Sequence, residues 1–174
     1  MEWENARKAR TGSMNVRFDA CSNTRIPCVK QMYRSDRYMV KPINKNIFFL
    51  QQKAEPATKA DAQVMRDLLD TMQAHQMECA GMAANMIGVN KRIIVVNLGM
   101  VNLLMVNPVI LSKSGKYETM EGCLSLSGER KAIRYREIEV EYQDKDMKKH
   151  TQKFNGWISE IIQHEMDHLE GILI

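Results

Sequence analysis

Apolar residues recur with a helical period over residues 58–78. Val64, Leu68 and Met72 follow one another every four residues and therefore lie on one face of a helix. The segment begins with threonine, a preferred N-cap, and Asp61 follows three residues later, as in a capping box. We therefore expect a helix over this whole segment.

Short runs of apolar and β-branched residues predict strands. The runs 46–50, 92–100 and 102–110 have strand length, and the last is expected to stop near Pro108, because proline cannot donate to a sheet ladder. Apolar and polar residues alternate strictly over 137–142, and the turn residues "DKD" follow. This pattern predicts a hairpin.

The segment 157–171, "WISEIIQHEMDHLEG", returns to a helical period and ends at Gly171, a residue that commonly terminates helices. The predicted order is thus a helix, several strands and a C-terminal helix. This order favours an α+β fold with mostly antiparallel sheets.

The first thirty-eight residues differ from the remainder, since their apolar residues are isolated and follow no period. We interpret residues 1–38 as an N-terminal extension or a leader added by an expression vector, and residues 39–174 as one domain. No apolar run approaches the roughly 20 residues of a membrane span. No secretory signal is visible either, so we expect no membrane partner and a cytoplasmic location.

The formal net charge of +4 is concentrated at the N-terminus. Residues 1–39 hold eight basic and four acidic residues, whereas residues 40–174 hold seventeen of each. The predicted domain therefore has no overall basic excess, and we expect no direct binding of nucleic acid.

The C-terminal helix contains a His-Glu-x-x-His pattern. His164 and His168 are four residues apart, so they lie on one helix face and can chelate one metal ion. At about 100° per residue, Glu165 falls within the apolar stripe, with the histidines along its edge. Burial would raise the pKa of this carboxyl toward the range useful for proton transfer. These features favour a catalytic metal site over a chance match.

A catalytic site of this type needs a third protein ligand. Cys123 is the best candidate, because glycine precedes it in "METMEGCLSL" and lets backbone approach a ligand closely. The alternative is a buried structural thiol, the commonest fate of a lone cysteine. Other possible ligands have weaker support: His75, His150, Asp167 and Glu170.

Three motifs in this order resemble the peptide deformylase family. The family pattern is Gly-x-Gly-Leu-Ala-Ala-x-Gln, then Glu-Gly-Cys-Leu-Ser, then Gln-His-Glu-x-Asp-His. This chain has "CAGMAANM" at 79–86, "EGCLS" at 121–125 and "QHEMDH" at 163–168. The second and third match at every defined position, and the resemblance covers about residues 40–174.

The resemblance implies a metal-dependent hydrolase that takes part in N-terminal processing during protein biosynthesis. Cys123, His164 and His168 would hold a divalent ion, Fe²⁺ in the cell, for which Zn²⁺, Ni²⁺ or Co²⁺ can substitute. Glu165 would move the proton for removing the formyl group from the N-terminal formyl-methionine of nascent chains, with release of formate. The ribosome is then a candidate neighbour.

The resemblance also implies a substrate site. The backbone N–H of Leu124 would stabilise the developing oxyanion, and the peptide would pair as an added strand with nearby backbone. The further substrate-binding residues implied are Ala80, Gly81, Met86, Gly122 and Arg130.

The first motif departs from the family pattern at three positions. Met86 replaces glutamine and cannot donate a hydrogen bond to an oxyanion, a loss that typically lowers the rate on the order of 10²–10³-fold. Cys79 replaces the first glycine, and Met82 replaces leucine. Two alternatives to an active deformylase stay open: a weakly catalytic paralogue that binds metal and formylated peptides, and an unrelated metalloprotease.

Overall fold

The computed structural model describes residues 38–174, so the prediction for the N-terminal extension lies outside the described residues apart from Tyr38. Five strands form one antiparallel sheet in which each strand pairs with the next along the chain. Together with the helices they confirm the α+β class. The elements are α1 (Ile47–Leu50), η1 (Lys59–Asp61), α2 (Ala62–Ala74), β1 (Gly81–Ala83), η2 (Ala84–Ile87), β2 (Ile93–Asn97), β3 (Asn102–Gly122), β4 (Glu129–Gln143), β5 (Lys149–Asn155) and α3 (Gly156–Leu169).

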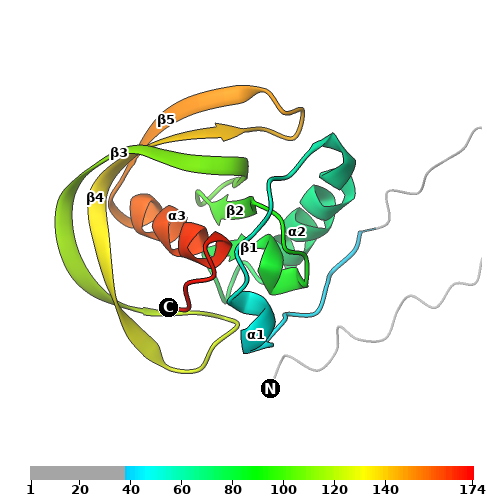
Figure 1. The fold of residues 1–174 in the computed structure, drawn as a ribbon, viewed down its shortest axis with the longest axis horizontal. Coiled ribbons are helices and arrows are strands. Elements are labelled where there is room, and N and C mark those ends of the chain that lie inside the picture. The colour runs from blue at the N-terminus through cyan, green and yellow to red at the C-terminus, as the bar shows by residue number, and fades with distance from the viewer. Residues whose placement is uncertain (1–37) are drawn as a thin grey trace, which may run out of the picture. The chain divides into compact units, whose positions relative to one another are not determined.

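The long hairpin of β3 and β4 curves around α3, and β1 and β2 lie on the other side of this helix (Figure 1). The expected stop near Pro108 is wrong, because β3 continues through it to Gly122. The register of β3 against β4 shifts between Val106 and Val109, and Asn107 adopts a left-handed φ of 51°. This irregularity removes the proline from the regular ladder, so the strand can continue beyond it.

The helix predicted over residues 58–78 begins where expected, but the prediction extends it too far at its C-terminal end. The Thr58 N–H donates to the Asp61 carboxylate at 2.7 Å, completing the expected capping box. The α-helix ends at Ala74, because the chain turns over 75–78 to enter β1. The predicted strand at 46–50 is wrong: the Asn46 side chain caps a single helical turn there.

The hydrophobic core lies between α2, β2 and α3. All four residues of the Ile93–Val96 run are buried, since helices or other strands cover both faces of β2. In β4, by contrast, Ile138, Val140 and Tyr142 are buried while the residues between them are more exposed, which confirms the predicted alternation. Within residues 38–174, no helix combines the length and apolar character needed to cross a membrane.

Side-chain hydrogen bonds attach α3 to the backbone of β4. The Gln163 amide accepts from the Tyr135 N–H at 3.0 Å and donates to the Tyr135 carbonyl at 2.9 Å. The Ser159 hydroxyl donates to the same carbonyl at 2.8 Å. Beyond the end of β5, these side chains therefore replace a strand as the partner of β4 and set the position of the helix.

The C-terminus of α3 is closed by a Schellman motif. Gly171 has a φ of 73°, its N–H donates to the His168 carbonyl at 3.2 Å, and the Ile172 N–H donates to the Asp167 carbonyl at 2.9 Å. A Cβ added to Gly171 would collide with the backbone carbonyl of Gln51. The predicted helix end at Gly171 is therefore confirmed. Glycine is required here both by the left-handed backbone conformation and by the contact with Gln51.

Replacing Gly171 by alanine should lower the free energy of unfolding by roughly 2–3 kcal/mol, because strain in the left-handed region adds to a clash with backbone. Chemical denaturation in urea measures this loss. Gly99→Ala is the matched control, since Gly99 has a φ of 95° with nothing within 4 Å of the added Cβ. It should lose only about 1 kcal/mol. Equal losses in the two variants would contradict the role of the Gln51 contact.

Candidate active site

The structure brings Cys123, His164 and His168 together. One ligand atom from each residue lies within 4.8 Å of the other two. Cys123 follows the end of β3, and the two histidines occupy successive turns of α3. The Cys123 Sγ is 3.2 Å from the His168 Nε2. Residues separated by some forty positions in sequence thus converge as three candidate ligands.

The chemistry of these three residues fits a divalent cation. Thiolate and imidazole are the ligands that zinc and iron sites use. Burial lowers the pKa of His168 to about 3, with help from the charges of His164 and Arg134, so this imidazole is neutral, as a metal ligand must be. Burial opposes protonation of His164, but hydrogen bonds to Cys123 and Glu121 outweigh it and raise the pKa to about 10. The surroundings therefore favour a positive charge at this point.

A buried ionic network orients His164. Its Nδ1 lies 2.8 Å from a Glu121 carboxylate oxygen, and Arg134 binds both oxygens of that carboxylate at 2.7 Å. Arg134 also contacts Asp167 at 2.7 Å. A carboxylate at Nδ1 leaves Nε2 as the nitrogen available to a metal. Burial raises the pKa of Glu121, but the hydrogen bonds from His164 and Arg134 outweigh it and hold the pKa below its usual value.

Sequence reasoning missed this network. Glu121 and Asp167 belong to the second and third motifs, so their position beside the candidate ligands was an available signal. Arg134 had no such signal. It stands opposite Tyr117 in the β3–β4 register, and only the folded hairpin shows that its guanidinium reaches Glu121 and Asp167.

Glu165 is buried, as the helical stripe predicted, with 3% of its surface exposed. Burial raises the pKa of this carboxyl to about 7, and one of its oxygens, Oε2, has no hydrogen-bond partner among the described residues. A Cβ on Gly81 would lie 2.6 Å from Glu165 Oε1 and 2.7 Å from Ile161 Cγ2. Glycine at this position is therefore what gives the carboxyl group its space, and the group can change protonation near neutral pH.

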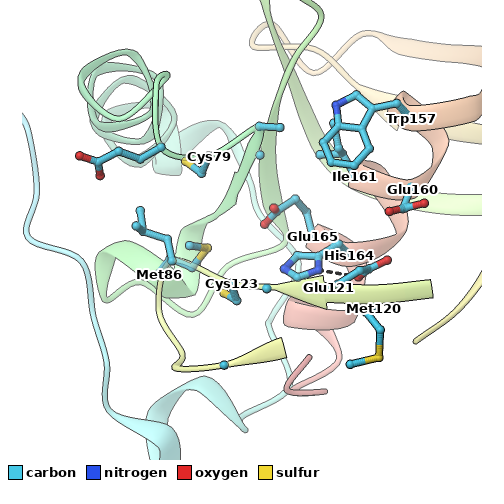
Figure 2. A pocket seen from close by; sticks show the side chains of 16 residues that line it. Cys79, Met86, Met120, Glu121, Cys123, Trp157, Glu160, Ile161, His164 and Glu165 are labelled. Carbon is cyan, nitrogen blue, oxygen red and sulfur yellow. Dashed lines mark hydrogen bonds and ion pairs between the residues drawn. The ribbon is translucent and has the colours of Figure 1, made fainter. Parts of the chain in front are cut away.

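A cavity of about 540 Å³ opens beside these groups (Figure 2). Most of the predicted site residues line it, but two do not. His168 is fully buried behind the wall, and Arg130 lies outside it with its guanidinium donating to the Ser127 carbonyl at 3.3 Å. The predicted residues that do line the cavity are Ala80, Gly81, Met86, Gly122, Cys123, Leu124, His164 and Glu165.

The wall contains two of the departures from the family pattern. The Met86 sulfur accepts a hydrogen bond from the Ala83 N–H at 3.5 Å, and its thioether offers no donor to the cavity. Burial, followed by the charges of Glu165, Glu78 and Cys123, raises the pKa of Cys79 to about 12, so it remains a thiol. Leu124 lies beyond the end of β3, so its N–H is outside the strand ladder.

The upstream turns of α3 also face the cavity, which sequence reasoning did not identify. Trp157, Glu160 and Ile161 line its wall at intervals of three to four residues before His164 and Glu165. This helical spacing, continued backward from the His-Glu-x-x-His pattern, was the signal that could have found them.

Comparisons with known proteins agree with this geometry. The family model for polypeptide deformylase matches residues 39–174. The peptide deformylase of Clostridium beijerinckii is 57% identical over 136 residues, covering 78% of this chain and 100% of that protein. The crystal structure of the peptide deformylase from Thermus thermophilus has a TM-score of 0.70 at 34% identity, covering 78% of this chain and 84% of that one. The class I type b enzyme from Acinetobacter baumannii, bound to Met-Ala-Ser, has a TM-score of 0.69 at 30% identity, covering 78% and 97%.

Replacing Arg134 by methionine should lower the free energy of unfolding by about 3–5 kcal/mol, because Glu121 and Asp167 would lose their shared cation in a buried site. Urea denaturation of the metal-free protein measures the effect apart from metal binding. Lys131→Met is the control, since the Lys131–Glu118 pair is exposed on both sides and should contribute less than about 1 kcal/mol. Similar losses in both variants would show that Glu121 and Asp167 do not depend on this cation in the folded protein.

Proposed function

The chain belongs to the polypeptide deformylase family of enzymes, and on that premise we propose which of its residues remove the N-formyl group from new polypeptides. Cys123, His164 and His168 hold one divalent metal ion, and Glu165 moves the proton. The observation that carries this proposal is the convergence of three candidate ligands beside a buried carboxyl group and an open cavity.

The proposed ion is Fe²⁺ in the cell, with Zn²⁺, Ni²⁺ or Co²⁺ able to replace it. A cysteine and two histidines as ligands suit all of these metals. When bound, the ion would supply Lewis acidity toward water and the formyl carbonyl. Glu121 holds His164 in the tautomer that presents Nε2, and the Ser125 N–H donates a hydrogen bond to the Cys123 sulfur at 3.4 Å.

Glu165 is the proposed general base and acid. Its pKa of about 7 allows it to accept the proton of the attacking water and to return one to the leaving amine. Water adds to the formyl carbon, the carbon–nitrogen bond breaks, and formate and a free amino terminus result. The apolar packing of Glu165 against Gly81 and Ile161 keeps bulk water away from the carboxyl group.

The peptide is proposed to pair with the free edge of β1. Among the described residues this strand ends the sheet and pairs only with β2, and Ala80 and Gly81 line the cavity. Gly122 also lines the cavity, and the Leu124 N–H is the proposed oxyanion donor. The Acinetobacter baumannii structure with Met-Ala-Ser supports a peptide of this kind as the occupant. Arg130 remains a proposed contact for substrate outside the cavity.

Family membership removes the unrelated metalloprotease from consideration, and the weakly catalytic binding paralogue is not favoured by the comparisons. Met86 is proposed to lower the rate, because it removes one donor while leaving the candidate metal ligands in place. A cytoplasmic location and action near the ribosome, where formylated chains emerge, complete the proposal.

Replacing Met86 by glutamine should raise the rate of formate release from formyl-Met-Ala-Ser on the order of 10²-fold. Its amide oxygen can accept from the Ala83 N–H, as the sulfur does, while its N–H₂ donates to the oxyanion. The measurement uses anaerobically prepared, iron-loaded protein. Met86→Leu is the control of similar volume without a donor. If glutamine and leucine give the same rate, the missing donor does not limit the reaction.

Glu165→Ala in the same assay should abolish formate release while the protein keeps its metal. Retention of most of the activity would refute the assignment of Glu165 as the group that moves the proton.

Replacing Cys123 by alanine should reduce bound metal well below one ion per chain, because it deletes one of three ligands. Metal content after dialysis against a weak chelator measures this loss by mass spectrometry. Cys79→Ala provides the control, since Cys79 also lines the cavity but lies outside the ligand cluster. Full metal retention by the Cys123 variant would refute its role as a ligand.

A further inference from the structure

The two histidines of the candidate ligand cluster differ in how their second ring nitrogen is held. His164 has the Glu121 carboxylate 2.8 Å from its Nδ1. In His168, Nε2 is the nitrogen that faces the cluster, since it lies 3.2 Å from the Cys123 sulfur. The Nδ1 of His168 is buried and has no hydrogen-bond partner within residues 38–174. A histidine that binds metal through Nε2 carries a proton on Nδ1 and almost always donates it, so this N–H needs an acceptor.

Only a few buried oxygens are available as that acceptor. Among the described residues, four buried side-chain oxygens lack a hydrogen-bond partner: Asn85 Oδ1, Asn90 Oδ1, Ser125 Oγ and Glu165 Oε2. Glu165 lines the cavity, whereas His168 lies behind its wall. Of these four residues, Asn85 is the one that is hydrogen-bonded to His168. Asn85 is therefore the best candidate.

The Asn85 amide is attached to His168 through its nitrogen. Its Nδ2 donates to the His168 carbonyl at 2.8 Å. That carbonyl lies in the last turn of α3, where no further helical turn can supply a donor. Asn85 is fully buried in η2, and the Asn44 N–H holds the backbone of η2 by donating to the Met86 carbonyl at 2.7 Å. The free oxygen of a firmly held amide thus belongs to a residue already in contact with His168.

We propose that Asn85 is a positioning residue for the metal ligand His168, with its Oδ1 accepting the Nδ1 proton through one buried water molecule. No direct hydrogen bond joins these two atoms in the described chain, and buried water commonly links polar groups of this kind. The link holds the ring in the tautomer that presents Nε2. This inference rests on the proposed function, because it concerns a ligand of the same candidate metal ion.

The position of Asn85 in the sequence supports a role particular to this chain. The family pattern leaves this position of the first motif undefined, and asparagine stands there directly before Met86. Met86 lines the cavity, whereas Asn85 does not and instead binds α3. Adjacent residues of η2 therefore act on different sides of the wall.

The test measures the affinity for Zn²⁺ by competition with a chromophoric chelator. Asn85→Leu keeps a similar volume but removes both the donor and the acceptor, and it should weaken Zn²⁺ binding roughly 10–100-fold. Asn90→Leu is the matched control, because the Asn90 Nδ2 also donates to a backbone carbonyl, that of Lys53 at 3.0 Å, and its Oδ1 is also buried without a partner among residues 38–174. The control should change the affinity by less than about twofold.

A spectroscopic measurement separates positioning of the ring from a general effect on stability. In ¹H–¹⁵N spectra of the Zn²⁺-loaded protein with labelled histidine, the Nδ1–H resonance of His168 should move upfield in Asn85→Leu, because the hydrogen bond is lost. The Nδ1–H resonance of His164, which Glu121 holds, should stay in place and provides the internal reference. A Zn²⁺ affinity within about twofold of wild type together with an unchanged His168 resonance would refute the role of Asn85.

Two further measurements keep the outcome decisive. If Asn85→Leu does not fold, a crystal structure of the Zn²⁺-loaded wild-type protein should show a water molecule within hydrogen-bond distance of His168 Nδ1 and Asn85 Oδ1. An Nδ1 bonded to another group would overturn the inference. Cys123→Ala separates the inference from the proposed function. Loss of Zn²⁺ in Cys123→Ala but not in Asn85→Leu refutes only the positioning role, whereas retention in both refutes the candidate ligands themselves.

Discussion

The buried ion pair between Glu121 and Arg134 is the interaction on which the site depends. It joins the two strands of the β3–β4 hairpin, and through His164 and Asp167 it joins that hairpin to α3. Cys123 follows Glu121 by two residues, so the pair also sets the distance between the cysteine and the two histidines. A buried ion pair adds little stability compared with apolar packing, because both charges lose their hydration. Its contribution here is geometric.

One face of α3 packs in the hydrophobic core, and the adjacent face lines the cavity of the candidate site. Ile162 and Leu169 are fully buried, and Gln163 replaces a missing strand along β4. The face that carries Ile161 and Glu165 closes the cavity against Gly81. Because the core and the strand contacts hold the helix in one position, the carboxyl group can be buried without a hydrogen-bond partner on one oxygen. Its raised pKa follows from that packing.

Met86 separates two properties that the family pattern combines. Its thioether fills the wall and accepts a backbone N–H, so packing is preserved. The candidate ligands Cys123, His164 and His168 come from other elements and do not depend on it. Under the proposed function, such a chain keeps its fold and candidate metal ligands and loses one donor to the oxyanion.

Local pattern was sufficient for the features that depend on neighbouring residues. The capping box at Thr58, the glycine end of α3, the alternation in β4 and the buried position of Glu165 all follow from spacing along one element. The motifs likewise predicted which cysteine lies beside the two histidines.

Other features depend on partners distant in sequence, and for these the local pattern gave a wrong prediction or none. The strand through Pro108 needs a shifted partner, and 46–50 became a helical turn under the cap of Asn46. The reach of Arg134 to Glu121 and Asp167 and the space left by Gly81 exist only once hairpin and helix are packed together. Each is set by distances between segments that the chain order does not specify.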